Sequence, residues 1–169
     1  MIQHTILFIS SLLISLNSGF AQEKKQDKNS ADEVVWKSLN KSASNIIDDE
    51  DIFTPEQELK LLEVINNYKK NRGIEFVIIS ISDLEKFKAL GLSDVHKWEN
   101  ESAKATGVML AISKGLHRMR IQNGDVVKIK VSDAATRLII DAFCVPKFQK
   151  DDYYQGVLDG MAEIVRRAR

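Results

Sequence analysis

Apolar residues recur at helical spacing between residues 55 and 72, and this stretch is predicted to be the first long helix. Thr54 can cap the helix, Pro55 suits its first position, and Gln57 completes a capping box. Gly73 is placed to end the helix in a left-handed conformation. The apolar residues that predict its inward face are Leu59, Leu62 and Ile65 and, less strictly, Leu61 and Tyr68.

Two nearly continuous apolar runs follow, at residues 74–82 and 107–113. Such runs are typical of central strands that are covered on both faces. The charged segment 83–104 between them is compatible with a helix and is expected to hold the crossover connection. After a short turn, residues 116–122 alternate as a returning hairpin strand does.

The last third of the chain is predicted to add an edge strand at residues 126–131 and then two helices. The first helix begins near Ser132 and Asp133 and ends before Pro146. The second begins at 151–152 and carries its apolar residues on one face. This order of elements predicts a single-domain α/β fold, with a mixed sheet of about four strands and helices on both faces.

The N-terminus has a different pattern, because residues 6–16 are almost entirely apolar. This run is too short to span a bilayer, and the small residues Gly19 and Ala21 follow it. The pattern predicts a signal peptide over residues 1–21, cleaved after Ala21. The alternative is a retained N-terminal anchor.

A charged segment without apolar periodicity follows, so residues 22–44 are expected to be a flexible tether and residues 45–169 the folded domain. The mature protein is expected to be periplasmic or otherwise exported, with no membrane span. Lys plus Arg and Asp plus Glu each total 24, which argues against a nucleic-acid partner. The single cysteine, Cys144, lies in an apolar stretch and is predicted to be a buried, unreactive thiol.

Several short motifs, in this order and spacing, resemble the TPM domain, a family of bacterial envelope and thylakoid-lumen proteins. The resemblance covers residues 45–165 and implies a compact α/β/α sandwich. The matching stretches are Ile46–Asp49, Phe53–Glu58, Gly107–Leu110, Arg118–Ile121 with Gly124, Ser132–Asp133 with Arg137–Ile140, Pro146–Phe148, and Asp152–Gly156.

The resemblance implies several activities, because members are described as acid phosphatases, as divalent-cation binders, and as assembly or repair factors for membrane complexes. The chain departs from the family pattern in two places. Ala105 and Thr106 precede Gly107 where the family often has Asp-Asn, and the stretch 123–127 replaces a Gly-aromatic-Gly motif that leads to a Glu. Both departures remove polar groups from a potential site.

Strand directions predict a candidate site from the residues themselves. The hairpin strand returns to the end where the two central strands begin, so Asn123, Asp125 and Asp133 are expected near one edge of the sheet. Oxygen ligands of this kind suit Ca²⁺ or Mg²⁺. A turn and a helix cap explain the same residues without a metal. The acidic run 48–51 is a second candidate, with a solvated loop as its alternative.

Two functions follow as hypotheses. The first is a non-catalytic envelope factor that binds a partner, such as a membrane protein complex, and a divalent cation. The alternative is a phosphatase whose metal is held by Asp49, Asp125 and Asp133. The sequence contains no phosphate-cradling glycine loop, no Gly-x-Ser-x-Gly motif and no zinc-spaced Cys or His set, so it identifies no catalytic residues.

Overall fold

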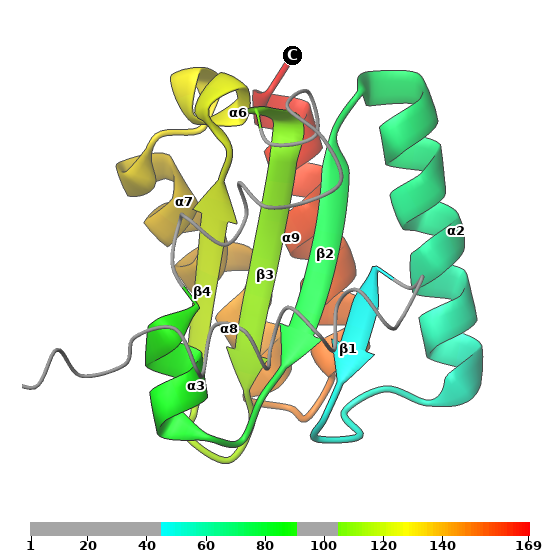
Figure 1. Ribbon diagram of the computed structural model, residues 1–169, viewed down its shortest axis with the longest axis vertical. Helices are drawn as coiled ribbons and strands as arrows, with labels where there is room; N and C mark the ends of the chain where they lie inside the picture. The colour runs from blue at the N-terminus through cyan, green and yellow to red at the C-terminus, as the bar shows by residue number, and fades with distance from the viewer. Residues whose placement is uncertain (1–44, 91–104) are drawn as a thin grey trace, which may run out of the picture.

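A computed structural model describes residues 45–90 and 105–169 of the chain. The predicted signal peptide, the tether and the second half of the crossover segment lie outside the described residues. The described ranges form one mixed four-stranded sheet with helices on both faces, as predicted (Figure 1). Its strands are β1 (Ile46–Asp48), β2 (Glu75–Ser80), β3 (Gly107–Ser113) and β4 (Arg118–Asn123).

The strands lie side by side in their sequence order. β1, β2 and β3 run parallel, and β4 returns antiparallel to β3. All residues of β2 and β3 are buried, which confirms the prediction of two central strands from their apolar runs. The sheet therefore has two distinct ends: the end where the parallel strands finish, and the end where they begin and β4 finishes.

Helix α2 (Pro55–Arg72) has the predicted bounds and caps. Thr54 and Gln57 form the capping box, and Gly73 ends the helix with φ 66°. The predicted apolar face was wrong at one position, because Leu59 is 64% exposed. Leu61 and Ile65 are the residues that α2 buries fully against the sheet, and they lie four positions apart on one helix face.

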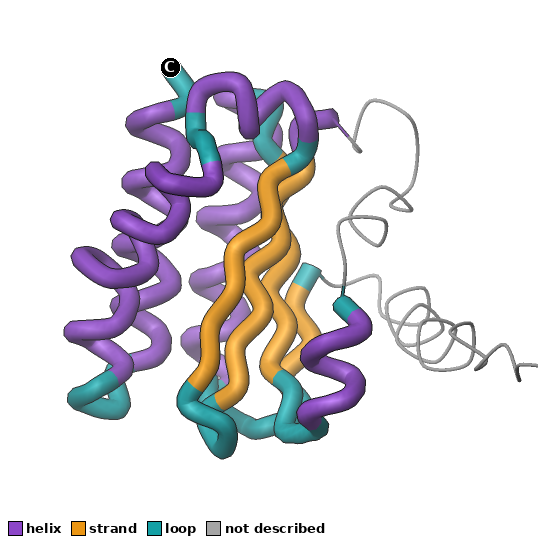
Figure 2. The backbone as a smooth tube through the Cα atoms, turned by 90° about the vertical axis from the view of Figure 1, so that its left-hand side faces the viewer, coloured by secondary structure: helices purple, strands orange, loops and turns teal. Residues whose placement is uncertain are grey.

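The two faces of the sheet carry unequal layers (Figure 2). One face packs against α2 and against the helices of the last third of the chain. The other face carries Val77, Ile79, Met109 and Ala111, and the described helix that packs there is α3 (Leu84–Ala89), through Phe87. The helices after β4 are α6 (Asp125–Lys130), α7 (Asp133–Ile139), the π-helix η1 (Ile140–Cys144), α8 (Val145–Phe148) and α9 (Tyr153–Arg167).

The edge strand predicted at residues 126–131 is wrong, because this segment is the helix α6. A hydrogen bond from Gly124 N to Gly107 O, 2.7 Å long, joins the end of β4 to the start of β3. Val127 and Val131, four residues apart, are then both buried, while Ile129 is exposed. Helical spacing therefore places two valines in the core, and the fourth strand of the sheet is β1 at the opposite edge.

The helix predicted to end before Pro146 instead continues past it through η1 and α8. Pro146 lies in the first turn of α8, where a missing backbone N–H is tolerated. Cys144, the last residue of η1, is completely buried, as predicted. Burial raises the pKa of its thiol to about 12. Helix α9 packs closely here, since a Cβ at Gly160 would lie 2.7 Å from Cys144 Sγ.

Candidate functional site

The polar residues singled out from the sequence lie at opposite ends of the sheet. Asp49 follows β1, whose last residue pairs with Ser80 at the end of β2. Asn123 pairs with Val108 at the beginning of β3. On β2, Ser80 and the residue level with Val108, Phe76, are four residues apart, which corresponds to about 13 Å along the strand. The structure therefore does not bring Asp49 together with Asn123.

The acidic turn, residues 48–51, uses its first carboxylate to hold the backbone. Asp48 accepts hydrogen bonds from the backbone N–H groups of Ile52, at 3.1 Å, and Phe53, at 2.9 Å. The hydroxyl of Ser80 also donates to Asp48, and the same hydroxyl accepts from Glu50 N at 3.0 Å. Asp48 therefore connects the end of β1 both to the end of β2 and to the start of the segment that leads into α2.

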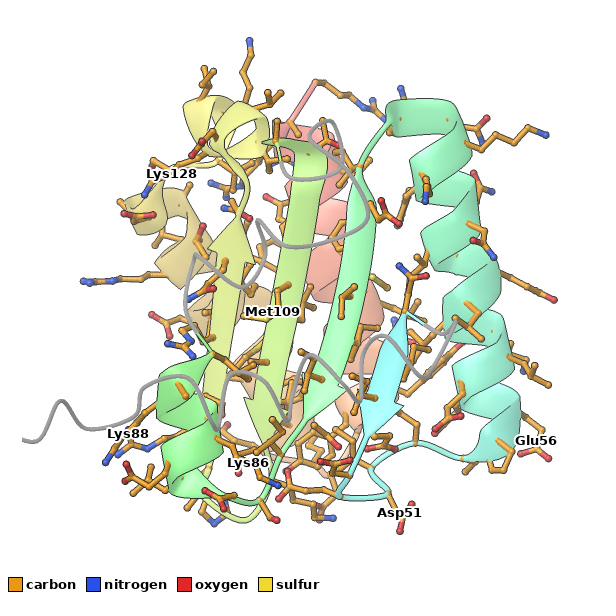
Figure 3. The ribbon with its side chains drawn as sticks, in the orientation of Figure 1. Asp51, Glu56, Lys86, Lys88, Met109 and Lys128 are labelled. Carbon is orange, nitrogen blue, oxygen red and sulfur yellow. The ribbon has the colours of Figure 1, made fainter. Side chains whose placement is uncertain are left out.

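Glu50 of the acidic turn has a similar role in a different loop. Its carboxylate accepts from the backbone N–H groups of Lys114, at 2.8 Å, and Gly115, at 3.0 Å, in the turn between β3 and β4. Asp49 and Asp51 are exposed, and Figure 3 shows Asp51 directed away from the sheet. Two of the four carboxylates are thus structural, and the other two face solvent.

A pocket of ≈ 330 Å³ lies close to this end, between the hairpin and α8. Its wall includes Ser113, His117 and Tyr153. The hydroxyl of Ser113 accepts from Leu116 N within the turn. Burial raises the pKa of the Tyr153 hydroxyl, and Lys114 lies 5.3 Å from the centre of its ring. The carboxylates of the acidic turn do not line this pocket.

The opposite end of the sheet contains a buried polar network around Asn123. Its side-chain amide donates to Val131 O at 3.0 Å and to Thr136 Oγ1 at 2.9 Å. The hydroxyl of Thr136 in turn donates to Ser132 O at 3.0 Å. These bonds connect the end of β4 to the start of α7. The carbonyl oxygen Asn123 Oδ1 is buried and has no hydrogen-bond partner.

Asn123 lines a groove of ≈ 370 Å³, called here the β4 groove. The unpartnered Oδ1 is a buried acceptor in this wall, and leaving such an acceptor unmatched costs about 1–3 kcal/mol. One side of the groove is formed by residues of β4, and the other side is formed by residues of the helices that follow it. It is lined by Met119, Arg120, Ile121, Gln122 and Asn123 of β4 and by Lys128, Asp133, Thr136, Arg137 and Ile140.

The helical side of the β4 groove carries charge. Lys128 and Asp133 form an ion pair with 3.2 Å between Nζ and Oδ1, in which the Lys128 side chain is partly buried and the Asp133 side chain is exposed. Figure 3 shows Lys128 at the α6 end of the molecule, far from Asp51. Arg137 is exposed and has no ion-pair partner within the described ranges. The groove thus carries one unpaired cation on its α7 wall.

Asn123, Asp125 and Asp133 were predicted at one edge of the sheet, and the structure puts all three at the end where β4 finishes. Asp125 and Asp133 are the exposed first residues of α6 and α7. Sequence reasoning missed Thr136, Lys128 and Arg137. The spacing of Ser132 and Thr136, four residues apart at a helix start, is the signal that could have identified the Thr136 hydroxyl.

The structure constrains the metal chemistry that is available. Within residues 45–90 and 105–169, no three His, Cys, Asp or Glu side chains are placed to share a metal ion. Of the three predicted ligands, Asn123 and Asp133 line the β4 groove, and Asp125 does not. In the same described ranges, no helix is long and apolar enough to cross a membrane.

Comparison with known families gives one match, to the model of the TPM domain over residues 46–167. No curated protein matches the chain.

Solved bacterial domains share the fold. The N-terminal domain of a protein from P. gingivalis has a TM-score of 0.62 at 17% identity, over 76% of this chain and 83% of that domain. A protein from the psychrophilic bacterium Bizionia argentinensis has a TM-score of 0.57 at 21% identity, over 71% of this chain and 83% of its own. The N-terminal domain of a Corynebacterium glutamicum protein has a TM-score of 0.57 at 10% identity, over 75% and 81%.

Proposed function

Because this chain belongs to the TPM domain family, we propose that it is an exported, non-catalytic factor of the cell envelope that binds a protein partner through α6 and α7. Four large apolar side chains are exposed in the described part of the chain, and three of them lie on these two helices. They are Val126, 50% exposed, Ile129, 79% exposed, and Leu138, 58% exposed. Exposed apolar residues that gather at one region are typical of protein-binding surfaces. The presence of three of the four exposed large apolar side chains on two consecutive helices carries the proposal.

The non-catalytic part of the proposal is supported by what the carboxylates do. Asp48 and Glu50 accept hydrogen bonds from backbone N–H groups, so they serve the loops that they connect. The metal-dependent phosphatase expected as the alternative needs Asp49 beside Asp125 and Asp133, and these residues lie at opposite ends of the sheet.

A photo-crosslinking amino acid placed at Ile129 of the full chain in its native host tests the partner surface. Leu59 is the matched control, because it is the fourth exposed large apolar side chain and lies on α2. We expect a discrete crosslinked species from position 129 and none from position 59. Equal crosslinking at both positions, or none at either, would contradict the proposal.

Export and the absence of catalysis have their own measurements. N-terminal sequencing of the protein from the native envelope should begin at Gln22. The purified protein should not hydrolyse p-nitrophenyl phosphate above the rate of the buffer, with either Ca²⁺ or Mg²⁺ present. Metal-dependent hydrolysis that disappears in the Asp125→Asn/Asp133→Asn double variant would show an enzyme instead.

A divalent cation at Asn123, Asp125 and Asp133 stays a prediction, and it is separate from the partner surface. A cation bound only by the folded state stabilises it by about 2.7 kcal/mol at a hundredfold excess over the dissociation constant. Millimolar Ca²⁺ should then raise the melting temperature, and the same double variant should abolish the rise. An unchanged melting temperature in chelator and in Ca²⁺ or Mg²⁺ would exclude the site.

A further inference from the structure

The outer edge of β4 has free hydrogen-bonding capacity. β4 is the last strand of the sheet and pairs with β3 on one side only, within the part of the chain that the structure describes. Hydrogen-bonded and non-hydrogen-bonded pairs alternate along an antiparallel ladder. Gly124 bonds to Gly107, and Ile112 O accepts from Ile81 N and so faces β2. This parity directs the backbone N–H and C=O groups of Met119, Ile121 and Asn123 away from β3.

These outward groups lie in the β4 groove instead of on a convex surface. Met119, Ile121 and Asn123 all line it, and Thr136 and Arg137 of α7 form the facing wall. Asn123 adds its unpartnered acceptor Oδ1 to the same wall. An unpaired strand edge beside a groove is the arrangement that an extended peptide uses when it adds a strand to a sheet.

The charges at this edge indicate what kind of segment would bind there. Arg137 on the groove wall and Arg118 at the start of β4 are both exposed, and neither has an ion-pair partner among the described residues. The one acidic residue of the groove, Asp133, is paired with Lys128. A second copy of this chain would bring like charges together across two β4 edges, which is unfavourable. An acidic strand is complementary.

We infer that the β4 groove accepts an extended, acidic segment of the partner protein as a fifth, antiparallel strand. This inference rests on the proposed function and adds to it the chemistry of the partner. In an antiparallel pair, directly opposite residues have their side chains on the same face of the sheet. The residues of the added strand that bond to Met119, Ile121 and Asn123 therefore point toward α7 and Arg137. We therefore expect the acidic side chains of the partner segment at these positions. The residues between them in the added strand point to the face of the sheet that carries α3.

A pair of N-methylated peptides separates strand addition from charge attraction. The probe is a capped octapeptide of alternating Val and Glu with a fluorescent label, titrated into the full chain and followed by anisotropy. N-methylation of every Glu removes the N–H groups that would face β4. N-methylation of every Val leaves them intact, at the same charge and with the same number of methyl groups. We expect the first modification to weaken binding about 30-fold or more and the second to change it little.

Charge variants test the acidic preference. Arg137→Glu should weaken binding of the Val-Glu peptide about tenfold. Lys60→Glu, an equivalent change on the exposed surface of α2, should leave it unchanged. A Val-Lys octapeptide should not bind. Amide hydrogen exchange followed by NMR should show new protection at Met119, Ile121 and Asn123 when the Val-Glu peptide is present.

Three results would overturn the inference: no binding of the Val-Glu peptide at millimolar concentration, equal binding of the two N-methylated peptides, or protection at α6 without protection at β4. Each can be told apart from failure of the proposed function. Crosslinking from position 129 without strand addition would leave a partner that docks only on the helices. Strand addition without crosslinking at position 129 would remove the α6–α7 surface and keep the groove.

Discussion

The two ends of the sheet use polar residues in opposite ways. At the acidic turn, the carboxylates of Asp48 and Glu50 each accept two backbone N–H groups, so the charges there are used within the fold. At the β4 groove, Asn123 leaves a buried acceptor unmatched and Arg137 has no ion-pair partner within the described ranges. Acidic residues are the usual candidates for a site in a sequence. Here the groups without partners lie at the end of the sheet that has fewer acidic residues.

The largest expected effect is at the acidic turn, where two neighbouring aspartates differ. Asp48→Ala removes the acceptor of Ile52 N, Phe53 N and the Ser80 hydroxyl, and should lower the free energy of unfolding by about 2–4 kcal/mol. Asp49→Ala, at an exposed side chain, should change it by less than about 0.5 kcal/mol. Urea unfolding measures both. Similar losses for the two variants would mean that the turn is not built on Asp48.

At the other end, Asn123→Ala should destabilise the fold by about 1–3 kcal/mol, because Val131 O and the Thr136 hydroxyl lose their donor in a buried place. The variant also removes the unmatched Oδ1, and the removal of this buried acceptor offsets part of the lost stability. The loss should therefore be smaller than for Asp48→Ala in the same urea experiment. A larger loss at Asn123 would reverse the comparison between the two ends.

A third type of carboxylate is paired with arginines, and its contribution to the stability of the fold should be lost in acid. Arg166, and then Arg167, hold the pKa of Glu163 at about 2, below its ordinary 4.5. A lowered folded-state pKa contributes stability that is complete above the unfolded value and is lost as the pH falls through the folded value. The unmodified protein should thus lose more stability between pH 4.5 and 2 than Glu163→Gln does. Parallel curves of stability against pH for the two proteins would show that the pairing contributes nothing.

A loss smaller than that of Asn123→Ala is expected at the exposed ion pair of the β4 groove. Asp133→Asn keeps the shape of the residue and breaks the pair with Lys128, so it should cost less than about 1 kcal/mol in the absence of divalent cations. Thermal melting in chelator measures this loss. A loss as large as that of Asn123→Ala would place Asp133 in the structural network and not at its surface.

Local patterns determined several elements of this protein by themselves. Helix α2 has the bounds predicted from Thr54, Gln57 and Gly73, because capping groups and left-handed glycine act within a few residues. The apolar runs determined β2 and β3, since a strand buried on both faces needs no polar positions. The burial of Cys144 also followed from its apolar neighbours.

Only the tertiary structure decided the remaining features. Residues 126–131 are consistent with a strand or a helix by pattern, and packing decided for the helix because it buries both Val127 and Val131. Strand directions placed Asn123, Asp125 and Asp133 correctly at one end, but they could not show that Asp49 lies at the other, since β1 was not predicted as a strand. The unmatched Asn123 Oδ1 and the free edge of β4 depend on which groups approach from distant segments. Hydrogen bonding across the fold is a property of three-dimensional neighbours, and the spacing of residues along the chain does not contain it.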